Sequence, residues 1–172
     1  MVKCMRFLIL PLVMTLGMAT VPASAQTLAL TGSDGRTAEL SAETIAALPR
    51  VTITFDAHGV SHVYEGPLLL DVLKSVGAPT GRDLRGAALA SVVLATAADG
   101  YQVAYGLAEA DPGTRPNRII LADRADGAPL DAGAGPFQIV VEGDLRPARS
   151  IRQVKTLEVR SLASARPAAE AH

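Results

Sequence analysis

The sequence predicts an α+β fold with mixed, mainly antiparallel β-sheets and a few short helices. Short runs rich in β-branched and aromatic residues recur along the chain, as in residues 51–55. Turn-forming dipeptides such as Asp99-Gly100 and Asp126-Gly127 lie between such runs and favour tight hairpins. Helical stretches are few and short, so strands mostly follow strands. This order is typical of α+β proteins.

The expected strands are short, and most of them are joined by hairpin-type turns. In chain order they are expected at residues 27–30, 37–40, 51–55, 60–65, 88–95, 101–105, 118–122, 137–142 and 154–159. The run at residues 88–95 is apolar except for Ser91, which is the pattern of a strand covered on both faces or of a buried strand edge against a helix. Residues 137–142 alternate in polarity, so we expect Ile139 and Val141 to be buried.

Two short helices and one helical turn are expected between these strands. Ser41 can cap a helix that runs through Ala47, because its hydroxyl can accept from a free backbone N–H. A second helix is expected over residues 68–75, with Gly77 at its end. Gly66-Pro67 should end the strand before this helix, because proline cannot donate to a ladder. The helical turn is expected at residues 107–110.

The first 25 residues have the features of a secretory signal peptide. Lys3 and Arg6 give a positive start, residues 7–21 are mostly apolar, and Ala23-Ser24-Ala25 is a small-x-small cleavage signal. We expect cleavage before Gln26, a periplasmic or secreted location and no membrane span after cleavage. The alternative is an uncleaved anchor, but the apolar run is shorter than the ~20 residues that a membrane helix needs.

The rest of the chain is expected to form one domain over residues 26–160, followed by a disordered tail at residues 161–172. Without Lys3 and Arg6, 14 of the 16 basic residues remain against 17 acidic ones, a net charge of −3. This charge balance gives no electrostatic footprint for nucleic acid. Cys4 leaves with the signal, so the mature chain has no disulfide, no thiol nucleophile and no thiolate ligand.

His58 and His62 are the histidines of the expected domain, and they lie on either side of Gly59 in a predicted turn. On a helix, this spacing would place two imidazoles on one face for a metal, but a turn does not. A solvated turn and a strand-face histidine are the alternative. We keep both histidines as ligand-binding candidates and assign no catalytic residue and no metal ligand.

Tyr101 and a cluster of basic residues are the other candidates. Tyr101 either presents its hydroxyl to a ligand or packs half-buried at the hairpin. The basic cluster consists of Arg146, Arg149, Arg152 and Lys155. Guanidinium groups suit phosphate or sulfonate, so Arg149 and Arg152 are candidates for an anion site. A solvated basic face is the alternative.

The order and spacing of several motifs between residues 51 and 159 resemble the molybdopterin-binding domain of the sulfite oxidase family. The motifs are Tyr64 to Leu73, Ala98 to Tyr101, Ile119 to Ala122, Asp126 to Leu130, Gly135 to Val141, and Ser150 to Arg152 before Leu157 to Val159. The resemblance implies a mixed α+β fold. In full members it also implies a pterin-held molybdenum that transfers an oxygen atom or electrons.

The chain departs from the family pattern at the metal. In the family, a cysteine follows the strand that residues 51–55 represent and ligates the molybdenum, whereas residues 55–62 contain none. The family often has Pro-x-Arg where this chain has Pro136-Phe137-Gln138. Arg152 stands at the lysine of the family's Ser-Val-Lys motif, and arginine does not replace lysine as a close phosphate contact.

These observations predict a short, exported, sulfite-oxidase-like domain that has lost cysteine-ligated molybdenum. It would act as a periplasmic binding or accessory module through a groove near His58, His62, Tyr101 and Arg152, for a small anion or a periplasmic protein partner. One alternative is a functional molybdopterin-dependent oxidoreductase with a histidine near the metal. Another is a sensor-linked binder of a small anion that depends on Arg149 and Arg152.

Overall fold

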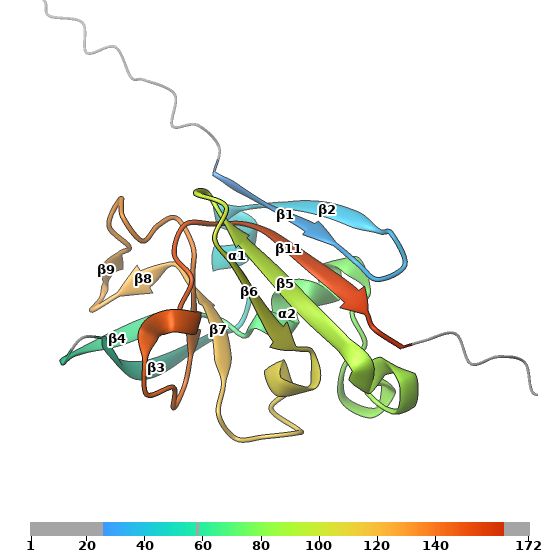
Figure 1. The fold of residues 1–172 in the computed structure, drawn as a ribbon. Coiled ribbons are helices and arrows are strands. Elements are labelled where there is room, and N and C mark those ends of the chain that lie inside the picture. Colours follow the sequence, from blue (N-terminus) through green and yellow to red (C-terminus); the bar gives the residue numbers. More distant parts are fainter. Residues whose placement is uncertain (1–25, 58, 164–172) are drawn as a thin grey trace, which may run out of the picture.

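The computed structural model describes residues 26–57 and 59–163, which form three β-sheets and a few short helices (Figure 1). The predicted signal peptide, His58 and residues 164–172 lie outside this part of the chain. No helix among the described residues is long and apolar enough to cross a membrane.

The largest sheet has five strands in the order β2-β1-β11-β5-β6. Its strands are β1 (Thr27–Thr31), β2 (Thr37–Ser41), β5 (Ser91–Ala97), β6 (Gln102–Gly106) and β11 (Val154–Ser161). β1 and β11 are parallel, and the other pairs of this sheet are antiparallel. β11 thus joins the two predicted hairpins β1–β2 and β5–β6 into one sheet.

A four-stranded sheet has the order β3-β4-β8-β9, and a two-stranded sheet pairs β10 with β7. The strands are β3 (Arg50–Ala57), β4 (Val60–Pro67), β7 (Ile119–Ala122), β8 (Arg124–Ala125), β9 (Ala128–Pro129) and β10 (Gln138–Val141). All of these pairs are antiparallel. β8 and β9 were not predicted, because two-residue strands are too short to show a periodic pattern.

The helices are short, as predicted. They are α1 (Ala42–Ala46), α2 (Leu69–Leu73) and five 3-10 turns, η1 (Lys74–Val76), η2 (Gly81–Asp83), η3 (Gly86–Ala90), η4 (Ala108–Ala110) and η5 (Pro147–Arg149). Ser41 caps α1 by accepting the N–H of Thr44, and Gly77 is left-handed after η1, both as predicted. These two residues therefore fix helix ends that the sequence alone identifies.

The two-stranded sheet β7–β10 is the middle layer of the molecule. Ile139 and Val141 pack into the larger hydrophobic core, as predicted from their alternation, together with residues of the five-stranded sheet. Val140 faces the other way and joins a second core with Ile53 and Phe55 of β3. All four residues of β10 are buried, so the alternation separates two cores rather than core from solvent.

Gly66-Pro67 ends the strand as predicted, but both residues belong to β4, which therefore ends at Pro67 and not at residue 65. A Cβ on Gly66 would overlap the backbone of Leu121, so glycine lets β4 lie against β7. Pro67 is tolerated because it is the last residue of the strand, opposite Arg50. The contact continues as a bridge between Leu68 and Ile120.

The predicted strand at residues 88–95 also starts too early. Residues 86–90 form η3, and β5 begins at Ser91. Ser91 pairs with Ser161, the last residue of β11, and beyond this pair the carbonyl of Ala90 accepts the N–H of Leu162 without extending the ladder. Leu89 is consequently exposed instead of covered on both faces.

Replacing Gly66 with alanine tests the contact between β4 and β7. The added methyl must push the two strands apart, so we expect Gly66→Ala to lower the free energy of unfolding by about 1–3 kcal/mol, measured by urea titration. Gly106→Ala is the matched control, because a Cβ there meets its nearest atom at an ordinary 3.6 Å. Equal stability of the two variants would contradict the close approach.

Candidate functional site

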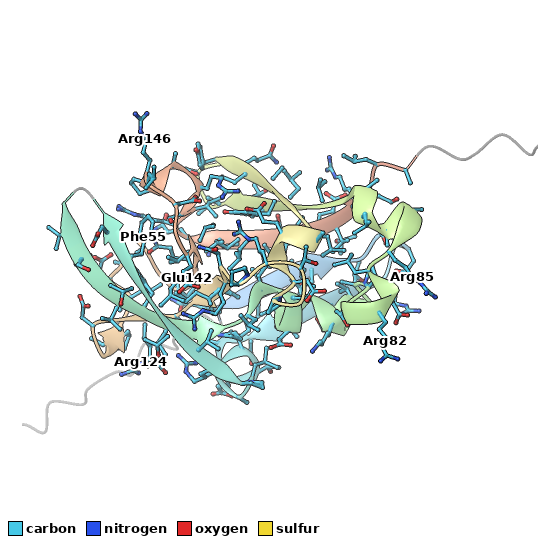
Figure 2. All side chains as sticks on the ribbon, turned by 90° about the horizontal axis from the view of Figure 1, so that it is seen from below. Phe55, Arg82, Arg85, Arg124, Glu142 and Arg146 are labelled. Atoms are coloured by element: carbon cyan, nitrogen blue, oxygen red, sulfur yellow. The ribbon has the colours of Figure 1, made fainter. Side chains whose placement is uncertain are left out.

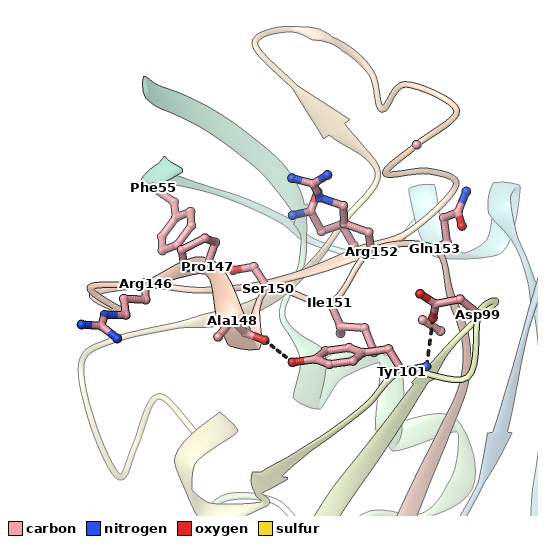
Figure 3. A pocket seen from close by; sticks show the side chains of 13 residues that line it. Phe55, Asp99, Tyr101, Arg146, Pro147, Ala148, Ser150, Ile151, Arg152 and Gln153 are labelled. Atoms are coloured by element: carbon pink, nitrogen blue, oxygen red, sulfur yellow. Dashed lines mark hydrogen bonds between the residues drawn. The ribbon is translucent and has the colours of Figure 1, made fainter. Parts of the chain in front are cut away.

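The principal pocket lies where three parts of the chain meet, and its volume is about 740 Å³. Phe55 comes from β3, Ala97, Asp99 and Tyr101 come from the turn between β5 and β6, and residues 146–148 and 150–153 come from the segment before β11. Gly133 and Gln138 complete the lining. Figure 3 shows Arg152 between Phe55 at one end and Asp99 and Gln153 at the other. We call this cavity the arginine pocket.

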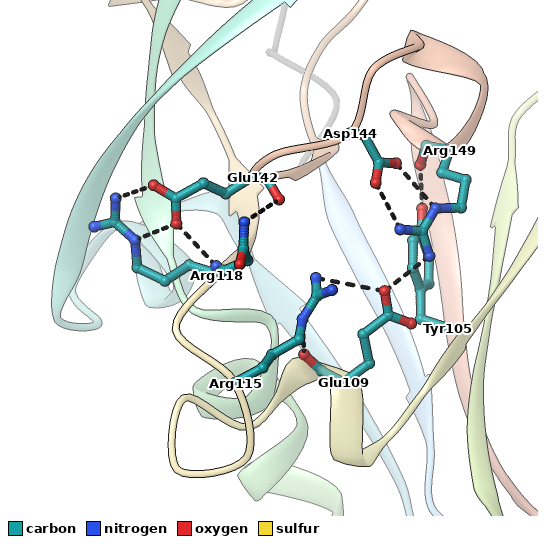
Figure 4. A network of polar contacts seen from close by, with 8 residues as sticks. Tyr105, Glu109, Arg115, Arg118, Glu142, Asp144 and Arg149 are labelled. Carbon is teal, nitrogen blue, oxygen red and sulfur yellow. Dashed lines mark hydrogen bonds and ion pairs between the residues drawn. The ribbon is translucent and has the colours of Figure 1, made fainter.

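Arg149 holds the segment before β11 in place (Figure 4). Its Nε and Nη2 donate to the two carboxylate oxygens of Asp144 at 2.9 and 2.7 Å, and its Nη1 donates to Glu109 at 2.9 Å. The two acceptors thereby neutralise the guanidinium of Arg149. These contacts join η5 to η4, although Glu109 of η4 lies 40 residues before Arg149 in the sequence.

The backbone of the same segment is bonded to two tyrosines of the β5–β6 hairpin. The hydroxyl of the fully buried Tyr105 donates to the carbonyl of Arg149, and that of Tyr101 donates to the carbonyl of Ala148 at 3.0 Å. Burial raises the pKa of Tyr105, which keeps its hydroxyl protonated as a donor. The guanidinium of Arg149 also lies 5.9 Å from the Tyr105 ring centroid.

The two ends of the segment are fixed as well. At its start, Arg118 forms a forked contact with Glu142 at 2.8 and 2.6 Å, and this contact lowers the pKa of Glu142. At its end, the carbonyl of Ile151 accepts the N–H of Ile139, and the N–H of Gln153 donates to Ala134. Ser150, Ile151 and Arg152 are therefore presented to the arginine pocket by a well-anchored backbone.

Ser150 and Arg152 have polar groups without a protein partner in the described part of the chain. Ser150 is only 7% exposed, and its hydroxyl forms no hydrogen bond. Arg152 is exposed, and neither an ion pair nor a side-chain hydrogen bond is found for it among residues 26–57 and 59–163. A buried hydroxyl normally has a partner, so the Ser150 hydroxyl has unused hydrogen-bonding capacity, but its oxygen is itself covered by protein atoms.

A second pocket of about 380 Å³ adjoins the first, since Gln138 and Arg152 line both. His62 lies in it and contacts Asp126, with 2.7 Å between Nδ1 and Oδ2. This hydrogen bond is the main reason that the pKa of Asp126 is lowered, and the N–H of Val63 contributes too. The carboxylate of Asp126 thus fixes the orientation of the His62 ring in the second pocket.

The structure places the predicted ligand-binding residues at different sites. Tyr101 lines the arginine pocket with its hydroxyl already bonded to Ala148, Arg152 lines both pockets, and His62 lines the second one. Arg149 lines neither of these two pockets and is bound by Asp144 and Glu109. Arg149 and Arg152 therefore do not face one anion site together. His58 lies outside the described residues.

The arginine pocket also has lining residues that the candidate set did not include. Arg146 belongs to the basic cluster, and it lines this pocket. Gln138 and Ser150 belong to motifs of the family resemblance, which did not identify them as site residues. Phe55 has no local sequence signal, because its place in the wall comes from contacts between distant segments.

The donor atoms do not fit a thiolate-ligated molybdenum. Within the described ranges, no group of three or more histidine, cysteine, aspartate or glutamate residues is placed to hold a metal. Cys4 belongs to the undescribed N-terminal residues. Phe55 and Asp56 stand where the family resemblance places the end of the strand before the cysteine, and neither supplies a soft sulfur ligand.

Comparison with known proteins identifies a distant relationship of fold. No family model matches the chain, and no curated protein matches its sequence. Among solved structures, it is similar to the sulfane dehydrogenase SoxCD from Paracoccus pantotrophus, with a TM-score of 0.61 and 16% identity. The match covers 84% of this chain and 41% of that chain, so this protein spans less than half of the length of its neighbour.

The fold is sulfite-oxidase-like. This result confirms the predicted fold class, α+β with mixed, mainly antiparallel sheets and a few short helices. At 16% identity, the likeness extends to the fold and not to the site. The chemistry of the site must therefore be argued from this chain's own residues.

Arg149 and Arg152 should differ sharply in their contribution to stability. Arg149→Gln leaves Asp144 without its cation and Glu109 with only the longer 3.4 Å contact to Arg115, so we expect a loss of about 1–3 kcal/mol in the free energy of unfolding. Arg152→Gln should change it by less than about 0.5 kcal/mol, because no partner is lost. Urea titration of both variants measures the difference, and similar losses would show that Arg152 has a structural partner.

Ser150→Ala should make the protein more stable. The substitution removes a buried hydroxyl that lacks a partner, so we expect a gain of about 1 kcal/mol, seen as a higher urea midpoint. Ser41→Ala is the control, and its free energy of unfolding should fall by about 1 kcal/mol, because the substitution removes the cap of α1. A loss of stability in Ser150→Ala would mean that the hydroxyl is satisfied within the protein.

Proposed function

We propose that this chain is an exported, periplasmic binding or accessory module that uses the arginine pocket to bind a small anion. The observation that carries the proposal is that Arg152 lines the pocket, is exposed and has no side-chain partner among the described residues. A guanidinium is a donor that sulfonate, phosphate and carboxylate groups accept. The leader at residues 1–25 supports export.

The proposal includes the loss of cysteine-ligated molybdenum. The sulfite-oxidase-like fold supports descent from a cofactor-binding domain, and the donor set argues against a metal held by thiolate. The rival function is a molybdopterin-dependent oxidoreductase, which the likeness to a sulfane dehydrogenase favours. The two functions differ in a measurable quantity, the molybdenum and pterin content of the protein.

The first test is the composition of the full chain, expressed with its leader in a host that makes molybdopterin. We expect periplasmic protein that begins at Gln26 by mass spectrometry and contains neither molybdenum by elemental analysis nor pterin by fluorescence. Stoichiometric molybdenum or pterin would overturn the binding-module proposal in favour of the oxidoreductase. Protein that remains in the cytoplasm with an intact leader would overturn the proposed location.

The second test is anion binding. We expect at least one member of a panel of sulfate, phosphate, methanesulfonate, benzoate and benzenesulfonate to raise the melting temperature at constant ionic strength, because ligands of the native state stabilise it. Arg152→Gln should abolish the shift. Arg82→Gln is the matched control, because it removes the same charge from η2, at the opposite end of the molecule from Arg146 (Figure 2). A panel with no shift that depends on Arg152 would refute anion binding.

A further inference from the structure

We infer that the ligand of the arginine pocket is an organic anion with an apolar body, rather than an inorganic oxyanion. This inference rests on the proposed function and specifies the class of ligand. It follows from the size of the pocket, from the residues that form its wall and from the distribution of charge along it.

The pocket is large for an inorganic anion. Its volume of about 740 Å³ lies within the range of about 300–1,000 Å³ that is usual for organic ligands. A sulfate or phosphate ion in contact with Arg152 would leave most of this space to water. A ligand that fills the pocket must therefore carry a body much larger than its charged group.

The wall of the pocket is apolar where the chain is most deeply buried. Phe55 is 3% exposed, Ile151 is 2% exposed and Ala97 is 8% exposed, and each belongs to a hydrophobic core. All three also line the pocket, so part of the core borders on the cavity. Because these three side chains are already covered, the apolar area that a ligand can take from water belongs to the more exposed lining residues Pro147, Ala148 and Tyr101, and its burial is favourable in proportion to the area covered.

The charges give the ligand a direction. Arg152 lies between the two ends of the pocket, and Ser150 is two residues before it (Figure 3). Asp99 lines the end formed by the β5–β6 turn, where its Oδ1 accepts the N–H of Tyr101 at 2.9 Å. An anionic group is repelled from this end and attracted to Arg152. The apolar body then lies toward Phe55, at the other end of the pocket (Figure 3).

Arg146 has a secondary part in this arrangement. It lines the pocket and, within the described part of the chain, takes part in no ion pair. Figures 2 and 3 show its side chain pointing away from the other lining residues. It therefore adds positive potential at the rim, which attracts an anion to the pocket without fixing its position.

Isothermal titration of the mature protein with sulfonates of increasing apolar size tests the inference. Sulfonates keep one negative charge, so methanesulfonate, benzenesulfonate and naphthalene-2-sulfonate differ only in the body. We expect benzenesulfonate to bind about tenfold or more tightly than methanesulfonate, because its ring covers the apolar wall. Benzenesulfonamide, the neutral analogue, should bind at least about tenfold more weakly than benzenesulfonate.

Two variants divide the contributions of head group and body. Arg152→Gln should lower the affinities for methanesulfonate and benzenesulfonate by about the same factor, because each ligand loses the same charge contact. Arg82→Gln should leave both affinities unchanged. Ala148→Trp fills the pocket from an exposed position and keeps the backbone carbonyl that Tyr101 uses. This substitution should lower the affinity for benzenesulfonate several-fold and leave the affinity for methanesulfonate unchanged. The fluorescence of the new tryptophan, in a chain that has none, checks that the variant is folded.

The outcomes separate this inference from the proposed function. If methanesulfonate, sulfate and benzenesulfonate bind equally well and all depend on Arg152, anion binding stands and the apolar body is refuted. If benzenesulfonamide binds as tightly as benzenesulfonate, the anionic part is refuted. If no sulfonate binds in a manner that depends on Arg152, both the inference and anion binding at this pocket fail.

Discussion

The arginine pocket depends on the ion pairs of Arg149. The guanidinium of Arg149 joins η5 to Asp144 and Glu109, and the backbone carbonyl of Arg149 accepts a hydrogen bond from the hydroxyl of Tyr105. A segment of about ten residues without a strand of its own would otherwise sample many conformations, at a cost in entropy for each residue that a ligand then orders. Because the protein orders it in advance, Ser150 and Arg152 already face the pocket. One arginine therefore positions another.

The β7–β10 layer provides the second constraint. Its alternate residues belong to two cores, one shared with the five-stranded sheet and one with β3. Phe55 of the second core and Ile151 of the first both line the arginine pocket, so the pocket opens where the two cores approach each other. Gln138, at the start of β10, lines both pockets and is only 4% exposed. A shift of this layer would change both pockets together.

The local features of the fold could be predicted from the sequence, and the contacts between distant segments could not. Ser41 and Gly77 mark helix ends through chemistry confined to a few residues, and Asp99-Gly100 marks a hairpin in the same way. The end of β4 was misjudged because the role of Gly66 lies in its contact with Leu121. The basic cluster shows the limit most clearly. Arg149 and Arg152 are alike in sequence, but Glu109, which lies 40 residues before Arg149, binds Arg149 and not Arg152.

The chain has the fold of a molybdenum enzyme, and its proposed function needs no metal. Two hydrophobic cores hold the strands of this sulfite-oxidase-like fold together. In our proposal, the cavity serves a ligand that needs no metal. The positive charge of Arg152 and an apolar wall are sufficient for this purpose.

The most direct measurement is nuclear magnetic resonance of the arginine Nε–H groups of the mature protein, with and without benzenesulfonate. We expect the signal of Arg149 to be protected and unchanged, since Asp144 already accepts its Nε–H. We expect the signal of Arg152 to shift and to become protected when the ligand binds. A shift confined to Arg149, or an Arg152 signal that is protected before any ligand is added, would contradict the division of roles between the two arginines.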